Sequence, residues 1–312
     1  MTKSSIATMF GAGDVKTFHG IPACASPAEV KSKAAILGVP CATPYASVGP
    51  YCAGGPAAIR AAAAPYAANL THVDFDLGEP LLPGGPADAC DLGDLPYTED
   101  NAANREAIRS AVSTIVDRGA VPVLIGGDDS IPIPMLQAFE GRGKYTIVQI
   151  DAHIDWRDDV GGERWGLSST MRRASEMDHI EAIIQVGARN IGSARPQDLA
   201  DAMAWGAHFF TARDVARDGI QPVLDAIPAG GNVIICFDCD GLDPSIMPGV
   251  IGRAPGGLGY WQTVELLSGI AAKSRIAAFD LVEFMPEQDV DGLGALTAAR
   301  MVTTALGLIC RQ

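Results

Sequence analysis

The stretch YTIVQIDAHID, residues 145–155, joins a largely apolar run to a group of ionisable side chains. The run ends at Ile150, and Asp151, His153 and Asp155 follow at alternate positions. Because alternate side chains of an extended chain lie on one face, these three converge if the extended backbone continues. Two carboxylates and an imidazole repel or desolvate one another unless a cation lies between them. The stretch therefore predicts a buried strand that leads into a metal site.

Short apolar runs of this kind recur along the chain and alternate with segments suited to helices. The runs lie at residues 34–40, 121–127, 145–151, 182–188, 232–238 and 275–283. The helix-compatible segments lie at 104–119, 195–206, 216–227 and 260–274. Continuously apolar runs are typical of strands covered on both faces, and their alternation with helices predicts a parallel sheet with crossover connections. Glycine and proline are concentrated in 40–56 and 78–96, which we expect to be long surface loops over the site.

Length and composition restrict the class of protein. No strong linker divides the 312 residues, so we expect a single α/β domain, with residues 1–33 as an N-terminal extension. The net charge of −14 argues against nucleic acids and anionic membranes as partners. No run of about 18 apolar residues suggests a membrane span, and residues 1–20 lack the apolar core of a signal peptide. Because seven cysteines suit a reducing compartment, we expect a cytoplasmic protein.

Acidic side chains follow four of the predicted strands. The segments are GGDDS (126–130), DAHID (151–155), DCDGLDP (238–244) and Glu283. The carboxyl ends of parallel strands lie at one edge of a sheet, where ligands bind. Six potential metal ligands are expected there: Asp129, Asp151, His153, Asp155, Asp238 and Asp240.

These ligand types favour a particular kind of metal site. Bridging carboxylates suit a cluster of two divalent ions. Oxygen-rich ligation with one imidazole favours Mn²⁺, with Ni²⁺, Zn²⁺ and Fe²⁺ as alternatives. The competing explanation is that the aspartates cap the helices that follow each strand. Capping explains Asp129 or Asp243 alone equally well, but it is the weaker explanation for the two alternating sets together.

The motifs resemble those of the ureohydrolase family, which includes arginase, agmatinase and guanidinobutyrase. They occur in family order as GGDDS, DAHID and FDCDGLDPSIMPGV (237–250). LVEFMP (281–286) resembles the terminal strand of the family, and GGPAAIR (54–60) resembles an early motif. The resemblance extends over about residues 35–310, and SSTMRRASEM (168–177) is closer to the agmatinase-like branch.

The resemblance implies a fold, an assembly and a reaction. The fold is an arginase-like three-layer αβα sandwich with a parallel sheet of about eight strands, assembled as a homotrimer or homohexamer. The reaction is hydrolysis of a guanidino compound to urea and an amine by a hydroxide held between two metal ions. Asp155 would hydrogen-bond this hydroxide and pass a proton to the leaving amine, while Glu283 would orient the cationic substrate.

The resemblance also implies how the two ions are held. Two carboxylates, Asp151 and Asp238, would bridge the ions. Asp129 and Asp155 would complete the coordination of one ion, and His153 and Asp240 that of the other. Mn²⁺ is the first expectation for both ions. Ni²⁺ is the second, because the family has nickel-dependent relatives.

Two departures from the family pattern bear on activity. Asp129 stands where the family usually has histidine, and it adds a negative charge to the site. WGLSST (165–170) lacks the histidine that many members use to transfer protons. Two hypotheses follow. The chain is an active amidinohydrolase with an unusual ligand set, or it is a weak or silent subunit that supports an active paralogue in a heteromeric complex.

The sequence leaves the substrate open among agmatine-like, guanidinobutyrate-like and alkylguanidine- or biguanide-like compounds. Four aromatic side chains near the predicted site either line a pocket for an alkylated guanidine or fill the surface and core: Tyr45, Tyr51, Trp156 and Trp165.

Overall fold

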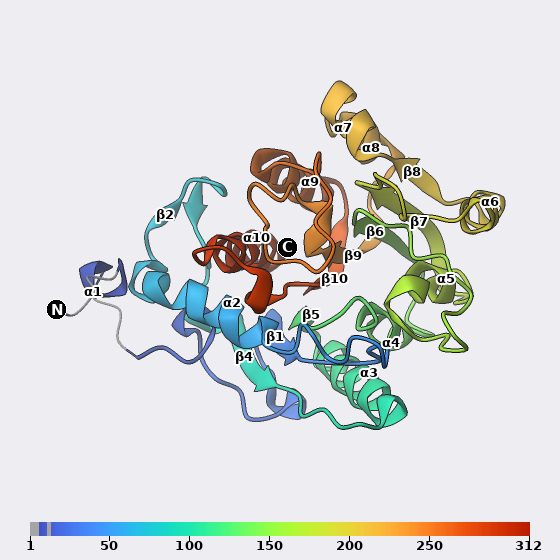
Figure 1. The fold of residues 1–312 in the computed structure, drawn as a ribbon. Coiled ribbons are helices and arrows are strands. Elements are labelled where there is room, and N and C mark those ends of the chain that lie inside the picture. The colour runs from blue at the N-terminus through green and yellow to red at the C-terminus, as the bar shows by residue number, and fades with distance from the viewer. Residues whose placement is uncertain (1–5, 11–13) are drawn as a thin grey trace.

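The computed structural model describes residues 6–10 and 14–312, and its centre is a fully parallel eight-stranded sheet (Figure 1). The strand order is β4-β1-β5-β10-β9-β6-β7-β8. In chain order the strands are β1 (Ala34–Val39), β4 (Ala89–Asp94), β5 (Val121–Gly126), β6 (Tyr145–Ile150), β7 (Ile180–Val186), β8 (His208–Phe210), β9 (Asn232–Asp238) and β10 (Arg275–Val282). A separate antiparallel ribbon pairs β2 (Val73–Asp74) with β3 (Glu79–Pro80).

Helices cover both faces of the sheet. One face packs against α2 (Gly55–Ala63), α7 (Ala212–Asp218), α8 (Gln221–Ala226), α9 (Tyr260–Lys273) and α10 (Leu293–Cys310). The other packs against α3 (Asn101–Asp117), α4 (Pro132–Gln137), α5 (Thr170–Ala174) and α6 (Pro196–Trp205). Neighbouring strand residues contribute to opposite layers, since Val148 belongs to the first core and Ile147 to the second. The expected three-layer αβα sandwich is therefore confirmed.

The N-terminal region before β1 contains short elements. They are α1 (Ile6–Phe10) and two short 3-10 turns at Phe18–Gly20 and Pro27–Glu29. Residues 1–5 and 11–13 of the expected extension lie outside the described residues. The remainder is attached to the sheet edge, because Ala23 forms a parallel bridge with Asp91 of β4.

All six predicted strands are present, but the prediction for residues 78–96 is wrong in part. Residues 89–94 form β4, which pairs only with β1 at the edge of the sheet. Its sequence, ACDLGD, is buried only in its first half, so it lacks the continuous apolar character of the central strands. The predicted helix at 216–227 is also two helices, because the chain takes a φ of 74° at Gly219.

Helix α10 is the longest helix that the sequence patterns did not predict. It is apolar nearly all round, so it has no amphipathic period by which to recognise it. By length and composition alone this helix could cross a membrane, but 78% of it is buried inside the protein. We therefore interpret α10 as a core helix of the sandwich.

A buried ion pair attaches α2 to the edge strand β4. The Arg60 guanidinium donates from Nε and a terminal nitrogen to the two carboxylate oxygens of Asp91, both at 2.8 Å. Asp91 is 1% exposed and also accepts a hydrogen bond from the backbone N–H of Phe18 at 2.8 Å. This carboxylate therefore joins the N-terminal region, α2 and the sheet.

Replacing Arg60 by leucine should strongly destabilise the fold, because it leaves the Asp91 charge buried without its partner. We expect a loss of about 3–5 kcal/mol in the free energy of unfolding, measured by urea denaturation. The control is Arg109→Leu, which breaks an exposed pair with Glu106 at 2.9 Å and should cost less than about 1 kcal/mol. Equal losses in both variants would show that the Arg60 pair has no special structural role.

Candidate metal centre

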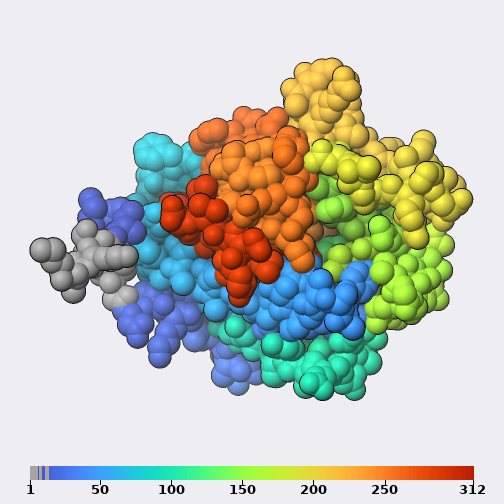
Figure 2. All heavy atoms as spheres, viewed as in Figure 1, coloured from blue at the N-terminus to red at the C-terminus, as the bar shows by residue number. Residues whose placement is uncertain are grey.

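Four adjacent strands bring the predicted acidic side chains to one edge of the sheet. Asp129 follows β5, Glu283 follows β10, Asp238 ends β9 and Asp151 follows β6. These four strands are neighbours in the sheet (Figure 1). Asp129, Asp238 and Glu283 line a cavity of about 260 Å³, whereas Asp151 is not one of its lining residues. The space-filling view shows segments from the first fifth of the chain, in blue, lying against orange and red segments from its last quarter (Figure 2).

The potential ligand atoms form two groups that share one residue. Asp151, His153 and Asp240 each offer an atom within 4.8 Å of the others, and so do Asp129, Asp151 and Asp155. Asp151 belongs to both groups, as a bridging ligand would. The family resemblance implies the same separation of Asp129 and Asp155 from His153 and Asp240, but Asp238, the second expected bridge, belongs to neither group. The assignment of each residue as a ligand stays a prediction. Asp238 lines the same cavity and accepts a hydrogen bond from the backbone N–H of Asp240 at 2.7 Å.

The electrostatics of the cluster favour a cation. Burial, together with repulsion between neighbouring carboxylates, raises the pKa values of Asp129, Asp151 and Asp238 well above the usual range. Burial also acts to lower the pKa of His153, but its hydrogen bond to Asp240 and the surrounding negative charge raise it to about 9. The distance from His153 Nδ1 to Asp240 Oδ2 is 3.1 Å. Five carboxylates cannot all be ionised here without compensating positive charge.

The donor set fits two divalent ions. The Oδ2 atom of Asp129 is buried and has no hydrogen-bond partner among the described residues. A buried carboxylate oxygen without a partner is costly unless something cationic binds it. Carboxylates with one imidazole suit ions such as Mn²⁺.

A chain of amide side chains supports the cluster, and sequence reasoning missed it. The Gln149 amide donates to Asp151 Oδ2 at 2.6 Å and to Asp155 Oδ2 at 2.8 Å. The Gln185 amide donates in turn to the Gln149 carbonyl, and Trp156 Nε1 donates to Gln185 Oε1 at 2.7 Å. Each glutamine interrupts an apolar strand, in YTIVQI and IEAIIQV, and that interruption was the available signal.

Glu283 is held rigidly at the end of β10. Its carboxylate accepts hydrogen bonds from the Tyr51 hydroxyl at 2.7 Å and from the backbone N–H of Asp129 at 2.9 Å. Burial and the nearby Asp128 carboxylate raise the pKa of Glu283 to about 8, although the hydrogen bonds from Tyr51 and Asp129 oppose this shift. Its φ of 64° is left-handed, a conformation that costs on the order of 1–3 kcal/mol in a non-glycine residue. These contacts fix a carboxylate at the cavity wall.

The four aromatic residues have different roles. Tyr51 and Trp156 line the cavity, although the Trp156 indole is 2% exposed and is largely a core side chain. Tyr45 and Trp165 do not line it: the Tyr45 hydroxyl accepts a hydrogen bond from the Ser168 N–H at 3.2 Å, and Trp165 lies beneath the Arg105 guanidinium. Only Tyr51 and Trp156 therefore agree with the expectation that the aromatic side chains line a pocket.

Asp243 has a structural role, although it stabilises a turn and does not cap a helix as the alternative explanation expected. Its carboxylate accepts hydrogen bonds from the backbone N–H of Ser245 at 2.9 Å and of Gly256 at 2.8 Å. It belongs to neither group of potential ligands. The acids of DCDGLDP thus divide into Asp238 and Asp240 in the cluster and Asp243 in a turn.

Comparison with known proteins places the chain beside several hydrolases. A profile of the arginase family matches residues 32–307. The chain is 29% identical over 302 residues to guanidinobutyrase of Pseudomonas aeruginosa, covering 93% of this chain and 91% of that protein. It is 27% identical over 262 residues to agmatinase of Pyrococcus horikoshii, covering 82% and 85%. The formimidoylglutamase structure from Bacillus subtilis shares the fold, with a TM-score of 0.81, 23% identity and coverage of 99% and 95%.

Replacing Asp151 by asparagine should remove most of the bound metal, because both groups of ligands lose the carboxylate they share. We expect about two ions per wild-type chain and well below one in the variant, measured by elemental analysis of dialysed protein. Asp243→Asn is the matched control, since it changes a nearby aspartate outside the cluster, and Glu283→Gln should also keep its metal. Full metal content in Asp151→Asn would exclude Asp151 as a bridging ligand.

Proposed function

Because the chain belongs to the arginase family, we propose that it is a binuclear metal-dependent amidinohydrolase acting on a guanidino carboxylate. The products would be urea and an amino acid. The family gives the reaction class, hydrolysis of a C–N bond in a linear amidine. The carboxylate on the substrate is inferred from the charges that line the cavity.

Arg157 is the observation that carries this choice of substrate. It is half-buried, and among the described residues that line the cavity it is the only lysine or arginine. Its guanidinium makes no ion pair or side-chain hydrogen bond within the described part of the chain. A substrate whose guanidinium lies against the acidic cluster and whose carboxylate meets Arg157 would pair both charges. Arginine is well suited to this role because it binds carboxylates in a bidentate manner.

A substrate with a cationic tail, such as agmatine, fits the cavity less well. Its ammonium would need an uncompensated acid away from the cluster, and Asp198 is the lining residue that could serve. Both carboxylate oxygens of Asp198 already accept hydrogen bonds from the Arg195 guanidinium, each at 2.9 Å. An alkylguanidine or biguanide without an acid group would leave Arg157 unpaired. The similarity to a guanidinobutyrase over 93% of this chain supports a carboxylate tail.

The side chains of this protein can then be given roles in the reaction. Two divalent ions at the cluster would supply positive charge that acidifies water near neutral pH. Glu283, fixed by Tyr51 and Asp129, accepts hydrogen bonds from the substrate guanidinium and orients its carbon. Water adds to that carbon, the bond to the alkylated nitrogen breaks, and Asp155 transfers the two protons of the water in turn to the leaving nitrogen, which departs as an ammonium and leaves urea. Gln149 keeps Asp155 in position for this transfer.

The silent-subunit hypothesis is supported by one specific feature. Ser168 and Leu167 line the cavity where many members of the family carry a histidine, and His153 is the only histidine that lines it among the described residues. Together with Asp129, this leaves the chain without two histidines of the usual pattern. The active and silent hypotheses differ in metal content and urea release.

Replacing Arg157 by glutamine should selectively reduce activity on substrates that carry a carboxylate. We expect kcat/KM for 4-guanidinobutyrate to fall about tenfold or more, because a charge-assisted hydrogen bond contributes roughly 1.5–3 kcal/mol. Activity on agmatine should be unchanged or higher. The control is Arg164→Gln, an exposed arginine paired with Asp158 at 3.2 Å outside the cavity. An equal fall for both substrates would show that Arg157 does not recognise the carboxylate.

Replacing Asp129 by histidine should separate the active from the silent hypothesis. In an active enzyme the variant keeps its metal and releases urea with a pH–rate profile moved to lower pH, because one negative charge has been removed from the site. In a silent subunit, metal binding should improve with little turnover. Metal stoichiometry and urea release are measured on both proteins. An unchanged metal content with an unchanged pH profile would show that Asp129 is not a ligand.

A further inference from the structure

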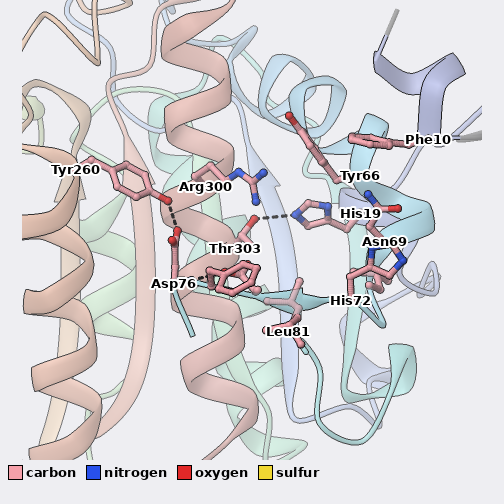
Figure 3. A pocket seen from close by; sticks show the side chains of 14 residues that line it. Phe10, His19, Tyr66, Asn69, His72, Asp76, Leu81, Tyr260, Arg300 and Thr303 are labelled. Atoms are coloured by element: carbon pink, nitrogen blue, oxygen red, sulfur yellow. Dashed lines mark hydrogen bonds between the residues drawn. The ribbon is translucent and has the colours of Figure 1, made fainter. Parts of the chain in front are cut away.

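A second cavity, of about 490 Å³, lies apart from the candidate metal centre (Figure 3). It is bordered by α1, by residues 66–76 and by helices α9 and α10. It shares no lining residue with the first cavity. Neither the proposed reaction nor the metal cluster therefore explains it.

Arg300 of α10 brings an unpaired cation into this cavity. Its guanidinium carbon lies 4.5 Å from the centre of the Tyr66 ring, which is the geometry of a cation–π contact. Within the described residues its guanidinium donates no hydrogen bond and makes no ion pair. A half-buried guanidinium has five N–H donors, so it is suited to an external carboxylate.

Two half-buried aspartates supply the opposite charge. Asp76 accepts a hydrogen bond from the Tyr260 hydroxyl, and Asp74 Oδ1 accepts one from the backbone N–H of Asp76 at 2.9 Å. Each carboxylate therefore keeps a second oxygen available. Burial raises the pKa of Tyr260, Asp76 and Asp74 raise it further, and Arg300 lowers it. Positively and negatively charged side chains therefore both influence the pKa of the Tyr260 phenol at the cavity wall.

The remaining wall is apolar and locally strained. Phe10, Tyr66 and Leu81 contribute ring and aliphatic surface. His19 is 3% exposed, and its Nε2 is hydrogen-bonded to Thr303 Oγ1 at 2.7 Å, as Figure 3 shows. The backbone of His19 has a left-handed φ of 49°, which costs on the order of 1–3 kcal/mol and persists only where surrounding contacts enforce it. The wall therefore combines apolar surface with a buried, hydrogen-bonded imidazole.

We propose that this cavity is a second binding site, for a zwitterionic amino acid whose carboxylate pairs with Arg300 and whose ammonium pairs with Asp74 and Asp76. A simple anion would pair with Arg300 but would face two carboxylates. A simple cation would leave Arg300 unpaired. Binding is independent of the proposed function, although the amine product of that reaction would itself be such an amino acid.

The test is calorimetric titration of the metal-loaded full-length protein with four probes of increasing charge separation: glycine, β-alanine, 4-aminobutyrate and 5-aminovalerate. We expect one of them to bind, and to bind more tightly than a carboxylic acid or an amine of the same length. Arg300→Gln and Asp76→Asn should each weaken this binding about tenfold or more. Arg213→Gln, which changes an exposed arginine on α7, should leave it unchanged.

Two further variants keep the result interpretable. Arg300→Lys retains the charge while losing the planar donors, so it should bind with intermediate affinity even if Arg300→Gln unfolds. Glu283→Gln changes the first cavity only and should bind the probe as the wild type does, whatever its activity. Failure of all four probes to bind would overturn the proposal. So would binding that is lost in Glu283→Gln but kept in Arg300→Gln, because the probe would then occupy the first cavity.

Discussion

Repulsion among buried carboxylates at the ends of four adjacent strands is the constraint on which the rest of the structure depends. Asp129, Asp151 and Asp238 are each at most 4% exposed, and within the described residues none of them forms an ion pair with a lysine or arginine. Such a cluster cannot be fully ionised in the folded chain unless cations bind there. Cation binding and folding are therefore linked, because ions that bind only the native state stabilise it.

Close backbone contacts hold the cluster together. The loop after β5 passes Pro40 so closely that any side chain at Gly127 would overlap the Pro40 carbonyl oxygen. At the end of β9, a Cβ on Gly241 would lie 2.8 Å from the Asp151 nitrogen. These contacts bring strand ends from distant parts of the sequence within the reach of short aspartate side chains.

Sequence patterns predicted the central sheet and the acids of the site because both depend on local periodicity. Continuous apolar runs identify central strands, whereas the edge strand β8 has three residues and one neighbour, so its sequence need not be apolar. Alternate spacing identified Asp151 and Asp155. It could not identify the hydrogen bond from Tyr51 to Glu283, which joins residues 232 positions apart, although Tyr51 was one of the aromatic candidates for the pocket. Partners of this kind are set by tertiary packing, and a single sequence carries no periodic signal for them.

The two cavities use the same physical means to distinguish ligands. Each cavity is lined by carboxylates and by one arginine that has no ion-pair partner among the described residues. Each cavity therefore favours a molecule that is anionic at one end and cationic at the other. They differ in the acids: those of the first cavity are deeply buried and grouped to hold ions, whereas Asp74 and Asp76 of the second are half-buried and free of any such cluster.

This difference matches the difference between a guanidino acid and an amino acid. A guanidinium spreads its charge over several N–H donors and needs a fixed acceptor such as Glu283. An ammonium concentrates its charge and can be bound by two half-buried carboxylates such as Asp74 and Asp76. A substrate and its product that differ only at the cationic end could therefore be sorted between the two sites, since the anionic end is recognised by arginine in both.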